Sequence, residues 1–143
     1  MDPIEEIKQT FFQECEELLA ELETGLLTLR AGDGDEETVN AVFRAVHSVK
    51  GGAGAFALDN LVSFSHVFET VMEEMRSECQ SQSRETFDVL LRAADLLVDL
   101  VREARGGAVV ATERTTLMTT ELNNCLAQNA ASPASECQSE DQF

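Results

Sequence analysis

The sequence has 143 residues, 43% of them hydrophobic, which suits one domain with a core and is too apolar for a disordered chain. Its net charge of −17 argues against nucleic acids and anionic membranes as partners and favours partners with basic or neutral surfaces. The chain starts without a signal-peptide pattern and contains no apolar run near 18 residues, so we expect a cytoplasmic protein with no membrane contact.

The four cysteines are widely separated and form no CxxC pair and no cluster with histidine. This spacing is unlike that of a zinc site, and a cytoplasmic protein keeps such thiols reduced. We therefore expect free thiols and no metal at Cys15, Cys79, Cys125 and Cys137.

The first predicted helix begins at the N-terminus, where Asp2 is placed to be the N-cap and Pro3 the first helical residue. Glu5 occupies the position of a capping box. Apolar residues then recur at three- and four-residue steps until a break at residues 31–35. The stripe consists of Ile4, Ile7, Phe11, Cys15, Leu18, Leu22, Leu26 and Leu29.

Three more amphipathic helices follow, each with a recognisable boundary. Asp35 or a neighbour caps the second, Asp59 caps the third after a bend near residues 57–58, and Ser83 caps the fourth after a polar loop at 80–83. Gly106 and Gly107 end the fourth helix. The stripes are Val39, Val42, Phe43, Val46, Val49 and Ala53; Leu61, Phe64, Phe68, Val71, Met72 and Met75; and Phe87, Leu90, Leu91, Ala94, Leu97, Val98 and Val101.

A shorter fifth helix is predicted from a cap at Thr112, followed by Leu117, Met118, Leu122, Cys125 and Leu126. Beyond about residue 128 the composition changes to Ala, Ser, Pro, Gln and Glu without periodicity. We predict a domain over residues 1–128 and a polar, disordered tail or linker over 129–143. Four amphipathic helices with short connections predict an all-α fold, an antiparallel four-helix bundle with the fifth helix packed at its side or end.

The segment HSVKGGAGAF, residues 47–56, places a histidine beside three glycines, each costing roughly 1 kcal/mol in a helix interior. On a helical wheel His47 lies about 105° from the apolar stripe, at its boundary. Gly51 and Gly54 lie within about 40° of the histidine, and Arg44 and Lys50 about 60° to either side. The glycines either clear a surface for a docking partner or admit a neighbouring helix.

The third helix provides a partner for the imidazole. Glu69 lies roughly 110° from that helix's apolar direction, so His47 and Glu69 can meet at the seam of two adjacent helices. A carboxylate that accepts the Nδ1–H bond fixes the tautomer and leaves the Nε2 lone pair facing solvent. His66 points away from its helix's core, so its role is either indirect or that of an ordinary surface residue.

These residues match a known family. AVHSVKGGAGAF (residues 45–56), followed by SHVFETVMEEM (residues 65–75), closely resembles the P1 histidine phosphotransfer (HPt) domain of CheA-type chemotaxis kinases, over about residues 1–128. The resemblance implies that His47 is phosphorylated, that Lys50 positions the phosphoryl group, and that Glu69 orients the imidazole. It also places His66 in the supporting network and makes Gly51 the residue that keeps the approach clear.

The reaction and the partners are likewise implied by the resemblance. An ATP-binding kinase domain phosphorylates His47, and a CheY- or CheB-type response regulator, which holds Mg²⁺, takes the group onto an aspartate. Arg44, Gly51 and Gly54 are the residues expected to face the partner. The sequence contains no P-loop and no glycine-rich ATP lid. We therefore expect a monomeric carrier domain of a longer protein, with no cofactor and no catalysis of its own.

Two alternatives stay open. In the first, the chain is a non-catalytic helical adaptor, His47 is structural and the glycines serve helix packing. In the second, the bundle binds a metal through His47, His66, Glu69 and Glu73. Bundle metal sites usually draw ligands from several helices, and the chain has only two histidines, which counts against the second alternative.

Overall fold

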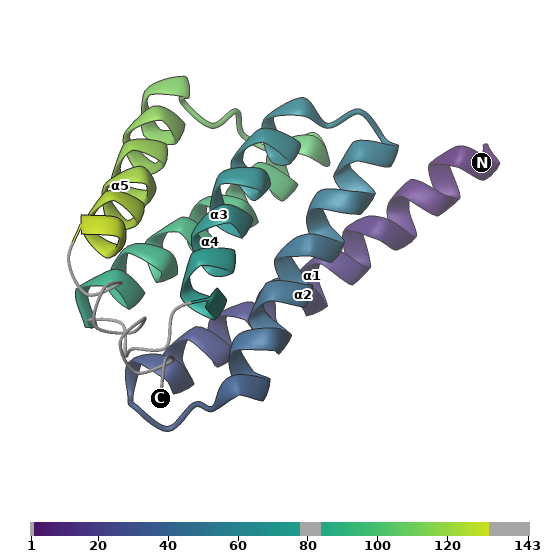
Figure 1. Ribbon diagram of the computed structural model, residues 1–143. Coiled ribbons are helices and arrows are strands. Elements are labelled where there is room, and N and C mark those ends of the chain that lie inside the picture. The colour runs from purple at the N-terminus through teal and green to yellow at the C-terminus, as the bar shows by residue number, and fades with distance from the viewer. Residues whose placement is uncertain (1, 78–83, 132–143) are drawn as a thin grey trace.

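The computed structural model describes residues 2–77 and 84–131, which form five helices and no strand (Figure 1). The predicted all-α fold is confirmed. None of the helices in the described part of the chain is long and apolar enough to cross a membrane. The helices are α1 (Pro3–Arg30), α2 (Glu36–Ala55), α3 (Asp59–Ser77), α4 (Arg84–Ala104) and α5 (Thr112–Ala131).

The first four helices form the bundle and the fifth packs on its side. Both α1 and α3 pack against α2 and α4, which closes the ring of four helices. Helix α5 packs against α3 and α4, and Figure 1 shows it on the opposite side of the molecule from the N-terminus of α1. It has 20 residues, as many as α2, so the prediction of a shorter fifth helix is wrong.

Local signals in the sequence account for the helix ends. The Asp2 carboxylate accepts a hydrogen bond from the backbone N–H of Ile4 and caps α1. Asp35 and Thr38 form a reciprocal capping box at the start of α2, with the Thr38 N–H donating to the Asp35 carboxylate over 3.0 Å. Gly106, with φ of +97°, adopts the left-handed conformation that ends α4. These three predicted boundaries are confirmed.

Other predicted boundaries differ by a few residues. Asp59 and Thr112, which were expected to be caps, are the first helical residues of α3 and α5, so each of these helices begins one residue earlier than predicted. Helix α5 continues to Ala131, so residues 129–131, expected to begin the tail, are helical. The predicted cap Ser83 with its polar loop, and the tail from residue 132, lie outside the described residues.

The buried core follows the predicted stripes except at their ends. Leu22, Leu26, Phe64, Phe68 and Leu97 are among its fully buried side chains. In contrast, three residues assigned to the stripes are largely exposed: Ile4, Ile7 and Leu117. The first turns of α1 extend beyond the bundle (Figure 1), where none of the four other described helices covers them. Helix α5 buries Met118, Leu122 and Cys125 and leaves Leu117 outside.

The described cysteines are buried and form no disulfide. Burial raises the pKa of the Cys15 thiol to about 12, and it also raises the pKa of Cys125. Both therefore remain protonated, poorly nucleophilic thiols at neutral pH. Cys79 and Cys137 lie outside the described residues.

Candidate functional site

His47 and Glu69 meet at the seam between α2 and α3, as the wheel predicted. The imidazole Nδ1 lies 2.6 Å from Glu69 Oε2. The His47 side chain is 63% exposed, whereas that of Glu69 is only 14% exposed. The ring thus projects into solvent while its anchor is largely enclosed by protein.

The buried faces of the two helices explain this placement. On α2, Val46 and Val49 are fully buried on either side of His47 in the sequence, which turns the histidine to the edge of the packed face. On α3, the buried Phe68 does the same for Glu69. Core packing between α2 and α3 therefore fixes the two backbones from which the imidazole and the carboxylate project.

The second oxygen of Glu69 binds Lys50, whose Nζ donates a hydrogen bond to Oε1 over 2.6 Å. Burial of the carboxyl group opposes its ionisation, but the hydrogen bonds from Lys50 and His47 outweigh burial and lower the pKa of Glu69. The group is therefore an ionised carboxylate at neutral pH and can only accept hydrogen bonds. Nδ1 must then carry the ring proton of neutral His47, which leaves the lone pair on Nε2.

The glycines beside His47 fall into two groups. A Cβ atom added to Gly51 or Gly54 would meet nothing within 4 Å. A Cβ atom on Gly52 would collide with the Phe11 ring of α1. Helix packing thus explains Gly52, whereas Gly51 and Gly54 leave bare backbone beside the histidine. Their role in docking stays a prediction.

Two other predicted residues are not part of this cluster. Arg44 is exposed and donates a hydrogen bond to Glu37 of its own helix over 3.0 Å. His66 is exposed, and its ring makes no hydrogen bond or ion pair with residues 2–77 or 84–131. The structure brings together His47, Lys50 and Glu69, and the roles assigned to Arg44 and His66 stay predictions.

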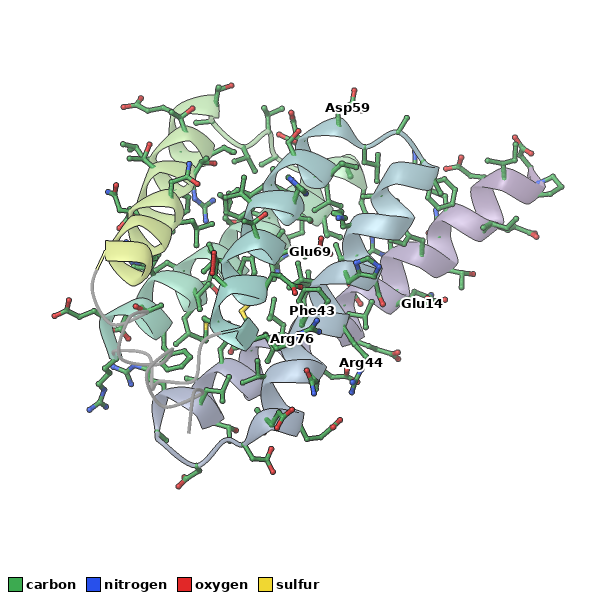
Figure 2. The ribbon with its side chains drawn as sticks, in the orientation of Figure 1. Glu14, Phe43, Arg44, Asp59, Glu69 and Arg76 are labelled. Carbon is green, nitrogen blue, oxygen red and sulfur yellow. The ribbon has the colours of Figure 1, made fainter. Side chains whose placement is uncertain are left out.

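Phe43 and Arg76 complete the surroundings of the imidazole, and sequence analysis missed both as site residues. The Phe43 and His47 rings are stacked, with centroids 6.0 Å apart and planes 10° apart. The Arg76 guanidinium lies over the Phe43 ring, 4.3 Å from its centroid. Figure 2 shows Phe43, Arg76 and Glu69 between α2 and α3.

Helical spacing carried a signal for both of these residues. Phe43 precedes His47 by four residues, which places the two rings on one helix face. Arg76 follows Glu69 by seven residues, two turns along the face of α3 that meets α2. Phe43 was assigned to the apolar stripe, and its half-buried ring does pack against the core on one side.

The four residues of the metal-binding alternative do not assemble into a metal site. Within residues 2–77 and 84–131, no group of three or more His, Cys, Asp or Glu side chains is placed to hold a metal ion. Fold and site together define an antiparallel helical bundle that presents one oriented imidazole on its surface.

Comparison with known proteins gives the family of this bundle. The family model described as Hpt domain matches residues 6–128. The chain belongs to the Hpt domain family, as the motif around His47 predicted. The chemotaxis protein CheA of Rhizobium meliloti (strain 1021) is 56% identical over 133 residues, which cover 90% of this chain and 18% of that protein.

Another CheA and one solved structure show the same similarity. CheA of Cereibacter sphaeroides is 50% identical over 110 residues, 75% of this chain and 16% of that protein. The chain thus spans less than a fifth of the length of these relatives. The crystal structure of the phosphorylated P1 domain of CheA3 in complex with CheY6 from R. sphaeroides matches with a TM-score of 0.77 and 27% identity. That match covers 86% of this chain and 97% of the other.

Proposed function

We propose that this chain is the phosphoryl-carrying domain of a CheA-type chemotaxis kinase and that His47 Nε2 is the phosphorylated atom. The observation that carries the proposal is the hydrogen-bond geometry of His47. An ionised carboxylate binds Nδ1, and the exposed ring presents its other nitrogen to solvent. Imidazole suits a carrier because it is a nucleophile when neutral and a good leaving group when protonated.

The two transfer steps follow from this geometry. In the first, the Nε2 lone pair forms the N–P bond as the bond from the γ-phosphorus of ATP to its bridging oxygen breaks, and that electron pair leaves with ADP. In the second, an aspartate oxygen of the regulator bonds to phosphorus and the N–P electron pair returns to Nε2. The proton stays on Nδ1, and Glu69 stabilises the positive charge that the ring carries while phosphorylated.

The partners are proposed from the relatives. A separate kinase domain binds ATP, and CheY- or CheB-type regulators accept the phosphoryl group and hold Mg²⁺. The solved P1 domain of CheA3 is phosphorylated and in complex with CheY6, which supports a regulator as the acceptor here. Lys50 would neutralise the transferred group, Gly51 and Gly54 would admit the partner, and Arg44 and His66 would contact it or support the site.

The setting of the domain is part of the same proposal. The chain corresponds to less than a fifth of the CheA relatives, so we propose that it acts within a longer cytoplasmic kinase. It would act there as a monomeric substrate domain without catalysis or a cofactor of its own. Phosphoryl transfer of this kind depends mainly on positioning and charge stabilisation, which an oriented imidazole and a nearby lysine can supply.

Phosphorylation with labelled ATP and the kinase domain of R. meliloti CheA tests the proposal. We expect His47→Gln to keep the fold, since the side chain is largely exposed, and to accept no phosphate. His66→Gln should still be labelled. The label should be acid-labile and alkali-stable, as a P–N bond requires, and should move to a CheY-type regulator. Labelling of His47→Gln would overturn the assignment of His47 as the phosphorylated residue. No labelling of the unmodified chain would favour the adaptor alternative.

A further inference from the structure

The imidazole of His47 has contacts on two sides, and the proposed function uses only one of them. Glu69 binds the ring at Nδ1, on the side of α3. Phe43, one helical turn earlier on α2, stacks against the ring with a centroid separation of 6.0 Å. Separations of 4.5–7 Å between offset, parallel rings are typical of attractive aromatic contacts.

A single hydrogen bond does not fix the orientation of an exposed ring. The bond to Glu69 places one atom, but the imidazole can still tilt about that contact, and its 63% exposure leaves few neighbours to prevent the movement. A parallel ring on one face removes this freedom because tilting would break the contact or drive the rings together. The interplanar angle of 10° shows that the imidazole lies nearly parallel to the Phe43 ring.

Phe43 is itself held from both sides. One part of its half-buried ring packs against the core of the bundle. The guanidinium of Arg76 on α3 lies over the ring at 4.3 Å, well within the range of a cation–π contact. Arg76 also contacts Glu73 of its own helix over 3.4 Å, which keeps the guanidinium close to the seam. The arrangement thus links α3 to the plane of the His47 ring through Phe43.

We propose that Phe43, clamped by Arg76, is a positioning residue that fixes the plane of the His47 imidazole for phosphoryl transfer. The inference rests on the proposed function of His47. In-line transfer requires the reacting atoms roughly 3–3.5 Å apart with their orbitals aligned, and an error near 1 Å can cost about 100-fold in rate. Glu69 holds the ring at Nδ1, so a ring that is free to tilt displaces the distant Nε2 by more than it displaces Nδ1.

The variant pair Phe43→Leu and Phe43→Tyr separates ring stacking from apolar packing. Leucine keeps most of the apolar contact with the core but has no flat face, whereas tyrosine keeps the ring. We expect Phe43→Leu to lower kcat for phosphorylation by the kinase domain by about 10-fold, since Glu69 still holds Nδ1. The KM for this domain should change by less than about 2-fold, because positioning acts on the reacting geometry and not on docking. Phe43→Tyr should restore the rate.

The mobility of the His47 ring gives a readout that a purely structural role would not change. NMR order parameters of the ring C–H groups should fall in Phe43→Leu and recover in Phe43→Tyr. Arg76→Gln should lower kcat by about 2- to 5-fold, the loss expected for an exposed cation–π contact, and Arg76→Lys should lose less. All rates are compared per folded molecule, with melting temperatures measured on the same samples.

Phe12 provides a matched control because it is also covered by an arginine. The Arg105 guanidinium lies 5.6 Å from the Phe12 ring centroid, and neither residue contacts His47. Phe12→Leu removes the same kind of packing and should lower the melting temperature without changing kcat per folded molecule. A similar kcat loss in Phe12→Leu would mean that stability, and not ring position, explains the effect at Phe43.

The remaining outcomes also decide the question. An unchanged kcat in Phe43→Leu, a rise in KM alone, or a Phe43→Tyr variant as slow as Phe43→Leu would overturn the positioning role while leaving His47 phosphorylation intact. If the unmodified chain accepts no phosphate on His47, the proposed function itself fails, and the inference fails with it. Labelled wild type with a slow Phe43→Leu and a rescued Phe43→Tyr supports both.

Discussion

At the scale of single residues, the site depends on one carboxylate with two partners. Glu69 uses Oε2 for the His47 ring and Oε1 for the Lys50 ammonium, each at 2.6 Å. These bonds keep the carboxylate ionised in spite of its burial, and they fix where the ring proton and the lysine charge lie. Loss of Glu69 should therefore disturb the His47 ring and the Lys50 ammonium together.

Glu69→Ala should slow phosphorylation of His47 by about 10- to 100-fold, the loss typical of removing a carboxylate that orients a functional histidine. The ring would then populate both tautomers, which ring ¹⁵N shifts report directly. Glu37→Ala is a suitable control because Glu37 is an exposed carboxylate that pairs only with Arg44 among the ion pairs of the described residues. An unchanged rate in Glu69→Ala, or an identical tautomer balance, contradicts the orienting role.

At the scale of helices, the C-terminal half of α2 contains glycines in two different environments, one packed against α1 and one open. Gly52 lets α2 approach α1, because the Phe11 ring occupies the space of its missing Cβ. Gly51 and Gly54 have open space at the same position and give α2 no packing advantage. The helix therefore gives up intrinsic stability at two positions where packing within the described structure does not require a glycine, as expected if these positions face a docking partner.

Alanine substitutions should distinguish the two kinds of glycine by the sign of the change in the free energy of unfolding. Gly54→Ala should stabilise the protein by up to about 1 kcal/mol, the gain in helix propensity, whereas Gly52→Ala should destabilise it by about 1–3 kcal/mol through overpacking against Phe11. Gly54→Leu should leave helix content intact and strongly slow transfer to the regulator. Urea unfolding and transfer rates on the same samples provide the measurements. A destabilised Gly54→Leu protein whose folded fraction transfers normally would show that this glycine serves packing.

Sequence periodicity predicted which helices exist and which residues lie at the α2–α3 seam, because both follow from a local repeat of 3.6 residues. It could not predict how far a helix extends beyond its neighbours, so Ile4 and Ile7 were assigned to a core that does not reach them. A wheel also gives the direction of a side chain and not what covers it. The position of the Arg76 guanidinium over the Phe43 ring depends on the register between α2 and α3, which is a tertiary property.

At the scale of the whole molecule, α5 lies outside the four-helix ring but supports the helix that carries Glu69. It packs against α3 and α4 and contributes the buried Met118 and Leu122 to the common core. A buried side chain of this size contributes about 1.5–3 kcal/mol. The seam between α2 and α3 is therefore stabilised by a helix that does not touch the site.

Two truncations test where the functional domain ends. Removal of residues 132–143 should leave the melting temperature and the rate of His47 phosphorylation unchanged, because that segment is polar and has no apolar periodicity with which to cover a core. A chain ending at Ala111 lacks all of α5, exposes apolar surface of α3 and α4, and should lose several kcal/mol of stability. Calorimetry and labelling of both truncated chains beside the full chain provide the comparison.

A lower melting temperature or slower labelling in the chain ending at Ala131 would show that the predicted tail is part of the folded domain. An undamaged protein after removal of α5 would instead place the domain boundary at the end of α4.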